Sequence, residues 1–135
     1  MDEYFAVLQQ YANFTGRTGR KEYWRFSLVH IGIAFALAMW LVAVFPNELG
    51  DNFRWRDLGA AGLPFYVMML YALATFIPTC AVTVRRLHDA DYSGWWLLVG
   101  FVPYAGEAVL FALLCLKGTA GDNRFGAEPD DYMDD

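Results

Sequence analysis

The sequence of 135 residues is poor in the residues that mark several protein classes. Charged residues make up 19% and hydrophobic residues 57%, against roughly 25% and 45–50% in an average soluble domain. This balance excludes an intrinsically disordered chain, because such chains have few apolar residues. Two cysteines are too few for a disulfide scaffold, and the twelve glycines follow no collagen-like period. The composition favours one unit that lies in a lipid bilayer.

Acidic charge is scarce outside the last fourteen residues. Residues 122–135 hold six acids and one base, and the rest of the chain holds nine of each. The body of the protein is therefore formally neutral, and no basic field attracts nucleic acid. We expect no nucleic-acid partner. We also expect a single domain over residues 1–129, followed by an acidic, disordered tail over residues 130–135.

Three segments lack the polar stripe that a helix of a soluble bundle would need. Residues 26–45 carry no formal charge, and about 20 helical residues cross a hydrocarbon core about 30 Å thick. Residues 58–84 are also uncharged and exceed what a straight crossing requires. Tilt, or a kink at Pro64 or Pro78, would absorb the excess. We expect this crossing at residues 63–83.

A third apolar segment covers residues 95–116 and contains Pro103, Gly106 and a single acid, Glu107. We expect a third transmembrane helix here. The alternative is that Pro103 and Gly106 form a turn, which would make the segment a re-entrant or interfacial hairpin. The predicted fold class is an all-α integral membrane protein with three transmembrane helices at about 26–45, 63–83 and 95–116.

The leader, residues 1–14, has apolar side chains at helical spacing and polar side chains opposite them. This pattern predicts a short amphipathic helix that lies in the membrane interface. The alternative, that the same face packs on the spans, is equally compatible with the pattern. The apolar stripe consists of Tyr4, Val7, Leu8 and Tyr11, with Phe5 and Phe14 beside it.

The basic residues of the short flanks predict the orientation. Six of them lie on the side of the leader and of the second loop, and four lie on the other side. We therefore expect the N-terminus in the cytoplasm and the C-terminal tail on the opposite side. The six are Arg17, Arg20, Lys21, Arg25, Arg85 and Arg86; the four are Arg54, Arg56, Lys117 and Arg124.

The second loop, residues 85–94, lies on the same predicted side as the leader, so their cations can converge beside one leaflet. Guanidinium groups bind phosphate oxygens, which predicts a site for anionic lipid headgroups. The alternative is ordinary membrane orientation with local ion pairs to Asp89, Asp91 or Glu22. His88 precedes Asp89 but has no nucleophile or second histidine, so we expect neither an enzyme nor a metal or cofactor.

Two polar residues fall inside the expected spans. His30 lies in the outer part of the first span, and Glu107 lies close to the middle of the third. An ionised carboxylate at mid-bilayer is costly, so Glu107 should pair, face protein or be protonated. The pair His30 and Glu107 is therefore a candidate intramembrane polar site.

Residues from both charged segments and from the chain's last third form a recognisable set. They are Gly16-Arg17, Arg20, Glu22-Tyr23-Trp24, Arg85-Arg86-Leu87-His88-Asp89, Ser93-Gly94-Trp95-Trp96, Pro103, Gly106, Asn123-Arg124-Phe125-Gly126 and Pro129. With this set the chain resembles the DUF805 family (domain of unknown function 805) from Tyr4 to Pro129. The resemblance implies a small bacterial inner membrane protein with three spans, and it implies no activity. Glu107 is not part of the set.

These observations lead to one main functional hypothesis and one alternative. The main hypothesis is a non-enzymatic accessory protein that binds anionic lipid headgroups or a membrane protein partner. The alternative is an oligomeric transporter or channel that uses Glu107. The residues predicted to bind the lipid or partner are Arg17, Arg20, Glu22, Trp24, Arg85, Arg86, His88, Asp89 and Trp95.

Overall fold

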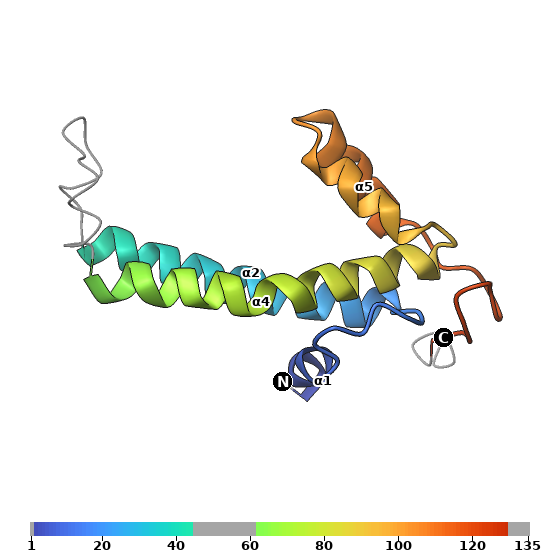
Figure 1. The fold of residues 1–135 in the computed structure, drawn as a ribbon, viewed down its shortest axis with the longest axis horizontal. Helices are drawn as coiled ribbons and strands as arrows, with labels where there is room; N and C mark the ends of the chain where they lie inside the picture. Colours follow the sequence, from blue (N-terminus) through green and yellow to red (C-terminus); the bar gives the residue numbers. More distant parts are fainter. Residues whose placement is uncertain (1, 45–61, 130–135) are drawn as a thin grey trace. The chain divides into compact units, whose positions relative to one another are not determined.

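The computed structural model describes residues 2–44 and 62–129, which are helical apart from turns and one isolated bridge between Asn123 and Gly126. The basic residues of the first loop and the acidic tail 130–135 lie outside the described residues. The chain divides into two compact units, Leu28–Phe76 and Met1–Ser27 with Ile77–Asp135. In chain order the helices are α1 (Asp2–Gln9), α2 (Arg20–Val44), α4 (Gly62–Asp89), the 3₁₀-helix η1 (Gly94–Phe101) and α5 (Ala105–Cys115) (Figure 1).

Two of the described helices, α2 and α4, are long and apolar enough to cross a bilayer. The helices predicted at 26–45 and 63–83 are confirmed, and each extends into flanking charged residues. Pro64 lies in the first turn of α4, where its missing N–H has no intrahelical partner to lose. The helix also continues through Pro78. Large apolar side chains of both helices are exposed, as lipid-facing surfaces are.

The leader forms the predicted helix only over its first part. In α1, Tyr4 and Val7 are buried, and the ring of Tyr4 stacks on that of Phe26 at 5.2 Å between centroids. The apolar face of α1 therefore packs on the protein itself. The sequence left two placements of this face open, the membrane interface and packing on the spans, and these contacts favour the second.

The expected second loop begins as helix. Residues 85–89 form the last turn of α4, and Tyr92 donates a backbone hydrogen bond to Leu87 at 2.9 Å. Asp91 has the left-handed φ of 61° that commonly ends helices. The loop is thus a tight C-terminal cap, and the charged residues 85–89 keep the fixed directions of helical side chains.

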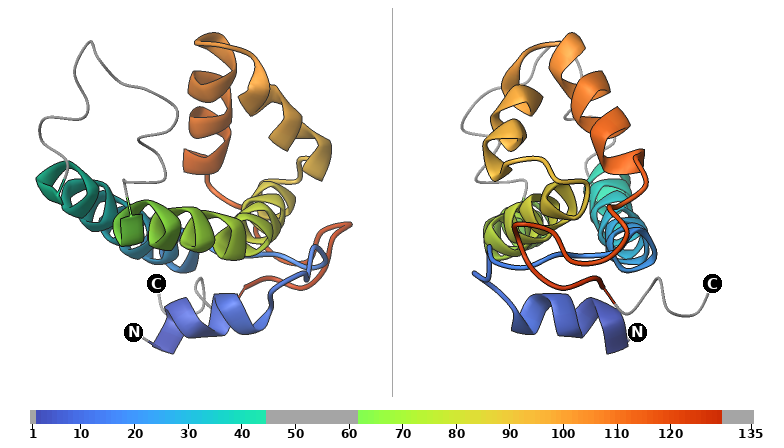
Figure 2. Two further views of the ribbon diagram at one scale, coloured as in Figure 1. Left: turned by 60° about the vertical axis from the view of Figure 1, so that its left-hand side comes forward. Right: turned by 90° about the vertical axis from the view of Figure 1, so that its right-hand side faces the viewer.

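The segment expected as a third continuous helix is a hairpin. The 3₁₀-helix η1 and α5 pack against each other and are joined by residues 102–104 (Figure 2). Tyr104 has a φ of 63°, and Ala105 donates to the Pro103 carbonyl at 2.8 Å, so the chain reverses in a γ-turn. The prediction of one transmembrane helix over 95–116 is wrong, because this turn breaks it.

Candidate functional site

One buried carboxylate, that of Asp89, bridges two guanidinium groups. Its Oδ1 accepts from Arg17 Nε at 3.0 Å, and its Oδ2 accepts from Arg86 Nη1. The side chains of all three residues are fully buried. The last turn of α4 places Arg86 and Asp89 three positions apart, on one face of the helix. These contacts confirm that the leader and the end of α4 meet.

The two other nitrogens of Arg86 hold the end of the helical hairpin. Nε donates to the Leu114 carbonyl at 3.1 Å, and Nη2 donates to the Leu116 carbonyl. The last carbonyls of α5 have no intrahelical donor, and they carry the negative end of the helix dipole. Arg86 therefore caps α5, and all three nitrogens of its guanidinium are used inside the protein.

Arg17 joins the leader to the chain that follows α5. Its Nη1 and Nη2 donate to the carbonyls of Gly121 and Thr119, both at 2.5 Å. The amide of Thr119 also donates to the Asp89 carbonyl at 2.9 Å. Residues 119–121 therefore contact the leader and the end of α4. The prediction that the tail leaves on the opposite side from the leader conflicts with these contacts.

The stretch after α5 makes two further contacts with this end of α4. Asn123 Nδ2 donates to the His88 carbonyl at 2.9 Å. The ring of Phe125 stacks on that of His88 at 3.9 Å between centroids, and His88 Nδ1 lies 3.2 Å from the Gly16 carbonyl. His88 is therefore a packing residue here, and no described nucleophile is bonded to it.

Arg124 forms the exposed counterpart of these buried pairs. Its Nε donates to Asp91 Oδ1 at 3.0 Å, and its Nη2 donates to the Asp91 carbonyl at 2.7 Å. Both side chains are about half exposed. Surface ion pairs of this kind contribute little to stability.

Arg85 differs from Arg17 and Arg86 in its hydrogen bonding. Its Nη1 donates to Gln10 Oε1, but its buried Nε and Nη2 have no acceptor among the described residues. The backbone carbonyl of Arg85 accepts from the amide of Thr18, whose buried hydroxyl also has no partner in this part of the structure. Burial lowers the pKa of the Arg85 guanidinium, and the negative charge of Glu22 acts against this shift.

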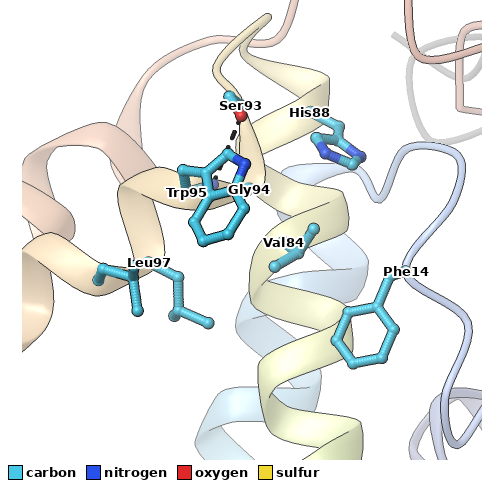
Figure 3. Close-up of a pocket in the computed structure, with 8 residues that line it drawn as sticks. Phe14, Val84, His88, Ser93, Gly94, Trp95 and Leu97 are labelled. Atoms are coloured by element: carbon cyan, nitrogen blue, oxygen red, sulfur yellow. Dashed lines mark hydrogen bonds between the residues drawn. The ribbon is translucent and has the colours of Figure 1, made fainter.

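An apolar pocket of about 560 Å³ lies between the leader, the end of α4 and η1 (Figure 3). Phe14 and Val84 form one side, and Trp95 with the two leucines after Trp96 forms the other. Its polar groups come from His88 and Ser93. Ligand pockets are usually apolar with a few polar groups and have about 300–1,000 Å³ of volume. This pocket fits that description.

Three other predicted binding residues, Arg20, Trp24 and Trp95, have different surroundings. Arg20 begins α2 and is half-buried. Trp24 packs edge-to-face on Phe111 of α5 at 5.7 Å between centroids. Trp95 lines the pocket but is 78% exposed. Trp24 thus positions α5, and Trp95 presents its ring outward.

The two candidate intramembrane residues lie in different units. His30 Nδ1 lies 2.8 Å from the Tyr71 hydroxyl, and the two rings stack at 5.3 Å between centroids. Glu107 is exposed in the first turn of α5, and no described residue bonds its side chain. The structure gives His30 a partner on the facing helix and does not pair it with Glu107.

Sequence reasoning missed the acceptors and partners that complete the cluster. Thr119 and Gly121 act through backbone carbonyls, which have no sequence signal. Asn123 and Phe125 belong to the residue set that carries the family resemblance, so that set contained a signal for them. No group of histidines, cysteines and acids among the described residues could hold a metal ion.

The sequence profile of the family described as protein of unknown function (DUF805) matches residues 11–127. The Inner membrane protein YhaI of Escherichia coli K12 is 43% identical over 129 residues, covering 96% of both chains. Inner membrane protein YhaH of the same strain is 39% identical over 96% of this chain and 97% of its own. The uncharacterized protein YiiR of the same strain is 28% identical, over 93% of this chain and 92% of its own. No solved structure matches.

Proposed function

This chain belongs to the DUF805 family, and from that premise we propose that it is a non-enzymatic accessory protein that binds an anionic phospholipid headgroup through Arg85. Two of its relatives are inner membrane proteins of E. coli. The headgroup would come from the cytoplasmic leaflet, which the basic residues flanking α2 predict. The lipid belongs beside the buried cluster, where the leader and the end of α4 meet.

One observation carries this proposal, the pair of unpaired nitrogens on Arg85. An arginine side chain stays charged in proteins, and a buried donor without an acceptor is costly. Arg17 and Arg86 use every guanidinium nitrogen within the protein. Arg85 keeps Nε and Nη2 for an outside acceptor. Phosphate oxygens suit two neighbouring guanidinium donors.

The charge balance among the buried groups around Arg85 also favours an anion. The guanidiniums of Arg17, Arg85 and Arg86 face the buried carboxylate of Asp89, with Glu22 as a second, less buried acid. Three positive groups against two negative ones leave an excess positive charge in a region of low dielectric. Such an excess attracts a phosphate more strongly than exposed lysines would.

A ligand would reach Arg85 from the side of the leader. The side-chain amide of Gln10 accepts a hydrogen bond from Arg85 Nη1, and Gln10 is exposed to solvent. A headgroup that binds Arg85 would displace this amide. The neighbouring pocket offers an apolar surface to an acyl chain. A phospholipid has both chemistries, whereas a soluble anion has only the first.

Native mass spectrometry of the protein in mild detergent would test the proposal. We expect wild type to retain phosphatidylglycerol or cardiolipin in preference to phosphatidylethanolamine. Arg85→Gln should lower the retained fraction about tenfold, because a hydrogen bond to a charged group contributes roughly 1.5–3 kcal/mol. Arg124→Gln removes an exposed cation and serves as the matched control, which should retain lipid as wild type does.

A second pair of variants separates binding from folding. Gln10→Ala and Glu22→Gln remove groups that compete with the phosphate for Arg85, so both should raise retention. Wild-type retention in Arg85→Gln would contradict the proposal. Lipid retention that rises in neither Gln10→Ala nor Glu22→Gln would also contradict the proposal. A protein that copurifies in place of lipid would favour a partner site instead.

A further inference from the structure

The two arms of the hairpin formed by η1 and α5 are too short to cross a bilayer. Eight residues of 3₁₀-helix and eleven residues of α-helix each extend about 16 Å, at roughly 2.0 and 1.5 Å per residue. This length matches about half of the hydrocarbon core, which is roughly 30 Å thick. Each arm is therefore as long as one leaflet is deep.

The reversal at the tip of the hairpin is built into the backbone. Pro103 and Tyr104 form the γ-turn, and Gly106 donates to the Val102 carbonyl at 3.0 Å. A Cβ on Gly106 would lie 1.9 Å from the Val99 carbonyl oxygen, so only glycine lets the arms approach this closely. The turn is thus a defined feature of the fold and not a kink in a longer helix.

Both ends of the hairpin lie at the last turn of α4. The chain enters η1 directly after the cap of α4, in which Tyr92 is bonded to Leu87. It leaves α5 where Arg86 binds the Leu114 and Leu116 carbonyls, and Thr119 then binds Asp89. A segment that starts and finishes at the last turn of α4 cannot cross a membrane once.

The surface of the hairpin is apolar and faces outward on several sides. Trp95 and Phe101 are 78% and 75% exposed, and Tyr104 at the tip is 93% exposed. The chain is a member of a family with inner membrane proteins, so acyl chains are the medium that such a surface fits. Glu107 is the polar exception, and it lies at the positive end of the α5 dipole.

We propose that residues 94–116 form a half-membrane hairpin that inserts into one leaflet, the leaflet on the side of the leader. The protein then has two transmembrane helices, α2 and α4. Residues 118–129 lie on the same side as the leader, where Arg17 binds them. The partner of the hairpin surface is the acyl-chain layer of that leaflet.

Cysteine labelling in oriented membranes would test this topology. The native Cys80 and Cys115 are first replaced by alanine. Single cysteines are then introduced at three described, exposed positions as Ala12→Cys, Ala120→Cys and Tyr104→Cys. Asn52→Cys, in the segment that links α2 to α4, marks the far side. Each variant is treated with a membrane-impermeant maleimide in right-side-out and in inside-out vesicles, after its purification yield is matched to the parent.

We expect the Ala12→Cys and Ala120→Cys variants to label from one side and the Asn52→Cys variant from the other. The Tyr104→Cys variant should stay unlabelled from both sides until detergent is added. Labelling of Ala12→Cys and Ala120→Cys from opposite sides would overturn the proposal in favour of a third span. Labelling of Tyr104→Cys in intact vesicles would also overturn it, because the tip would then reach water.

Discussion

The two units of the chain are stabilised in different ways. In the unit Leu28–Phe76, helices α2 and α4 expose large apolar side chains, and His30 with Tyr71 is the polar pair described between them. The other unit buries Arg17, Arg86 and Asp89 in one hydrogen-bonded cluster. The comparison teaches that the helices of the first unit offer mainly apolar surface, whereas the second unit combines an apolar hairpin with a buried charge cluster that joins segments far apart in the sequence.

The largest expected effect tests the charge cluster. Asp89→Asn removes the carboxylate that two buried guanidiniums share and should lower the free energy of unfolding by roughly 3–5 kcal/mol. Titration with SDS from a mild detergent would measure it. Asp91→Asn is the matched control, because Asp91 pairs with Arg124 at the surface, and it should cost at most about 1 kcal/mol. Equal losses of unfolding free energy in Asp89→Asn and Asp91→Asn would contradict the contrast between the buried charge cluster and the exposed Asp91–Arg124 pair.

A smaller effect is expected at the glycine that closes the hairpin. Gly106→Ala places a Cβ against the Val99 carbonyl and should destabilise the protein by roughly 1–3 kcal/mol through overpacking. Gly32→Ala in α2 meets no atom within 4 Å and should stabilise its helix by up to about 1 kcal/mol. The same SDS titration should therefore show opposite signs. A neutral Gly106→Ala would mean that the arms do not approach as described.

The smallest effect is expected in the apolar unit. Tyr71→Phe removes the hydroxyl that contacts His30 and should cost about 0.6 kcal/mol and no more than about 1.7 kcal/mol, as interhelical hydrogen bonds in membranes do. Tyr66→Phe in the same helix is the control, because its exposed hydroxyl bonds no described residue. If Tyr71→Phe lowered the free energy of unfolding more than Asp89→Asn does, the comparison between the two units would be contradicted.

Sequence reasoning located the long apolar helices and the charged residues that meet. Uninterrupted apolar runs define α2 and α4, because a bilayer requires every backbone group in a span to be bonded within its own helix. The pairing of the leader with residues 85–89 was also expected. The sequence did not distinguish the three arginines, since Arg17, Arg85 and Arg86 have the same side chain and differ only in their acceptors.

The third apolar segment shows the same limit. Pro103 and Gly106 suggested a possible turn, but apolar composition alone fits both a span and a hairpin. The contact of Gly106 with Val99 and the return of the chain to Arg86 distinguish them. Those contacts depend on how the arms pack, and composition carries no information on packing.

By itself the sequence determined an α-helical membrane protein and predicted three crossing helices, because length and apolar content decide whether a helix can span. Only the tertiary structure decided that the third segment turns back and that Arg85 keeps two free donors. The reason is physical, since the deciding hydrogen bonds join residues that are distant in the sequence, 28 positions apart for Arg86 and Leu114 and 75 positions apart for Arg85 and Gln10. Such contacts follow from the folded backbone and from no local pattern.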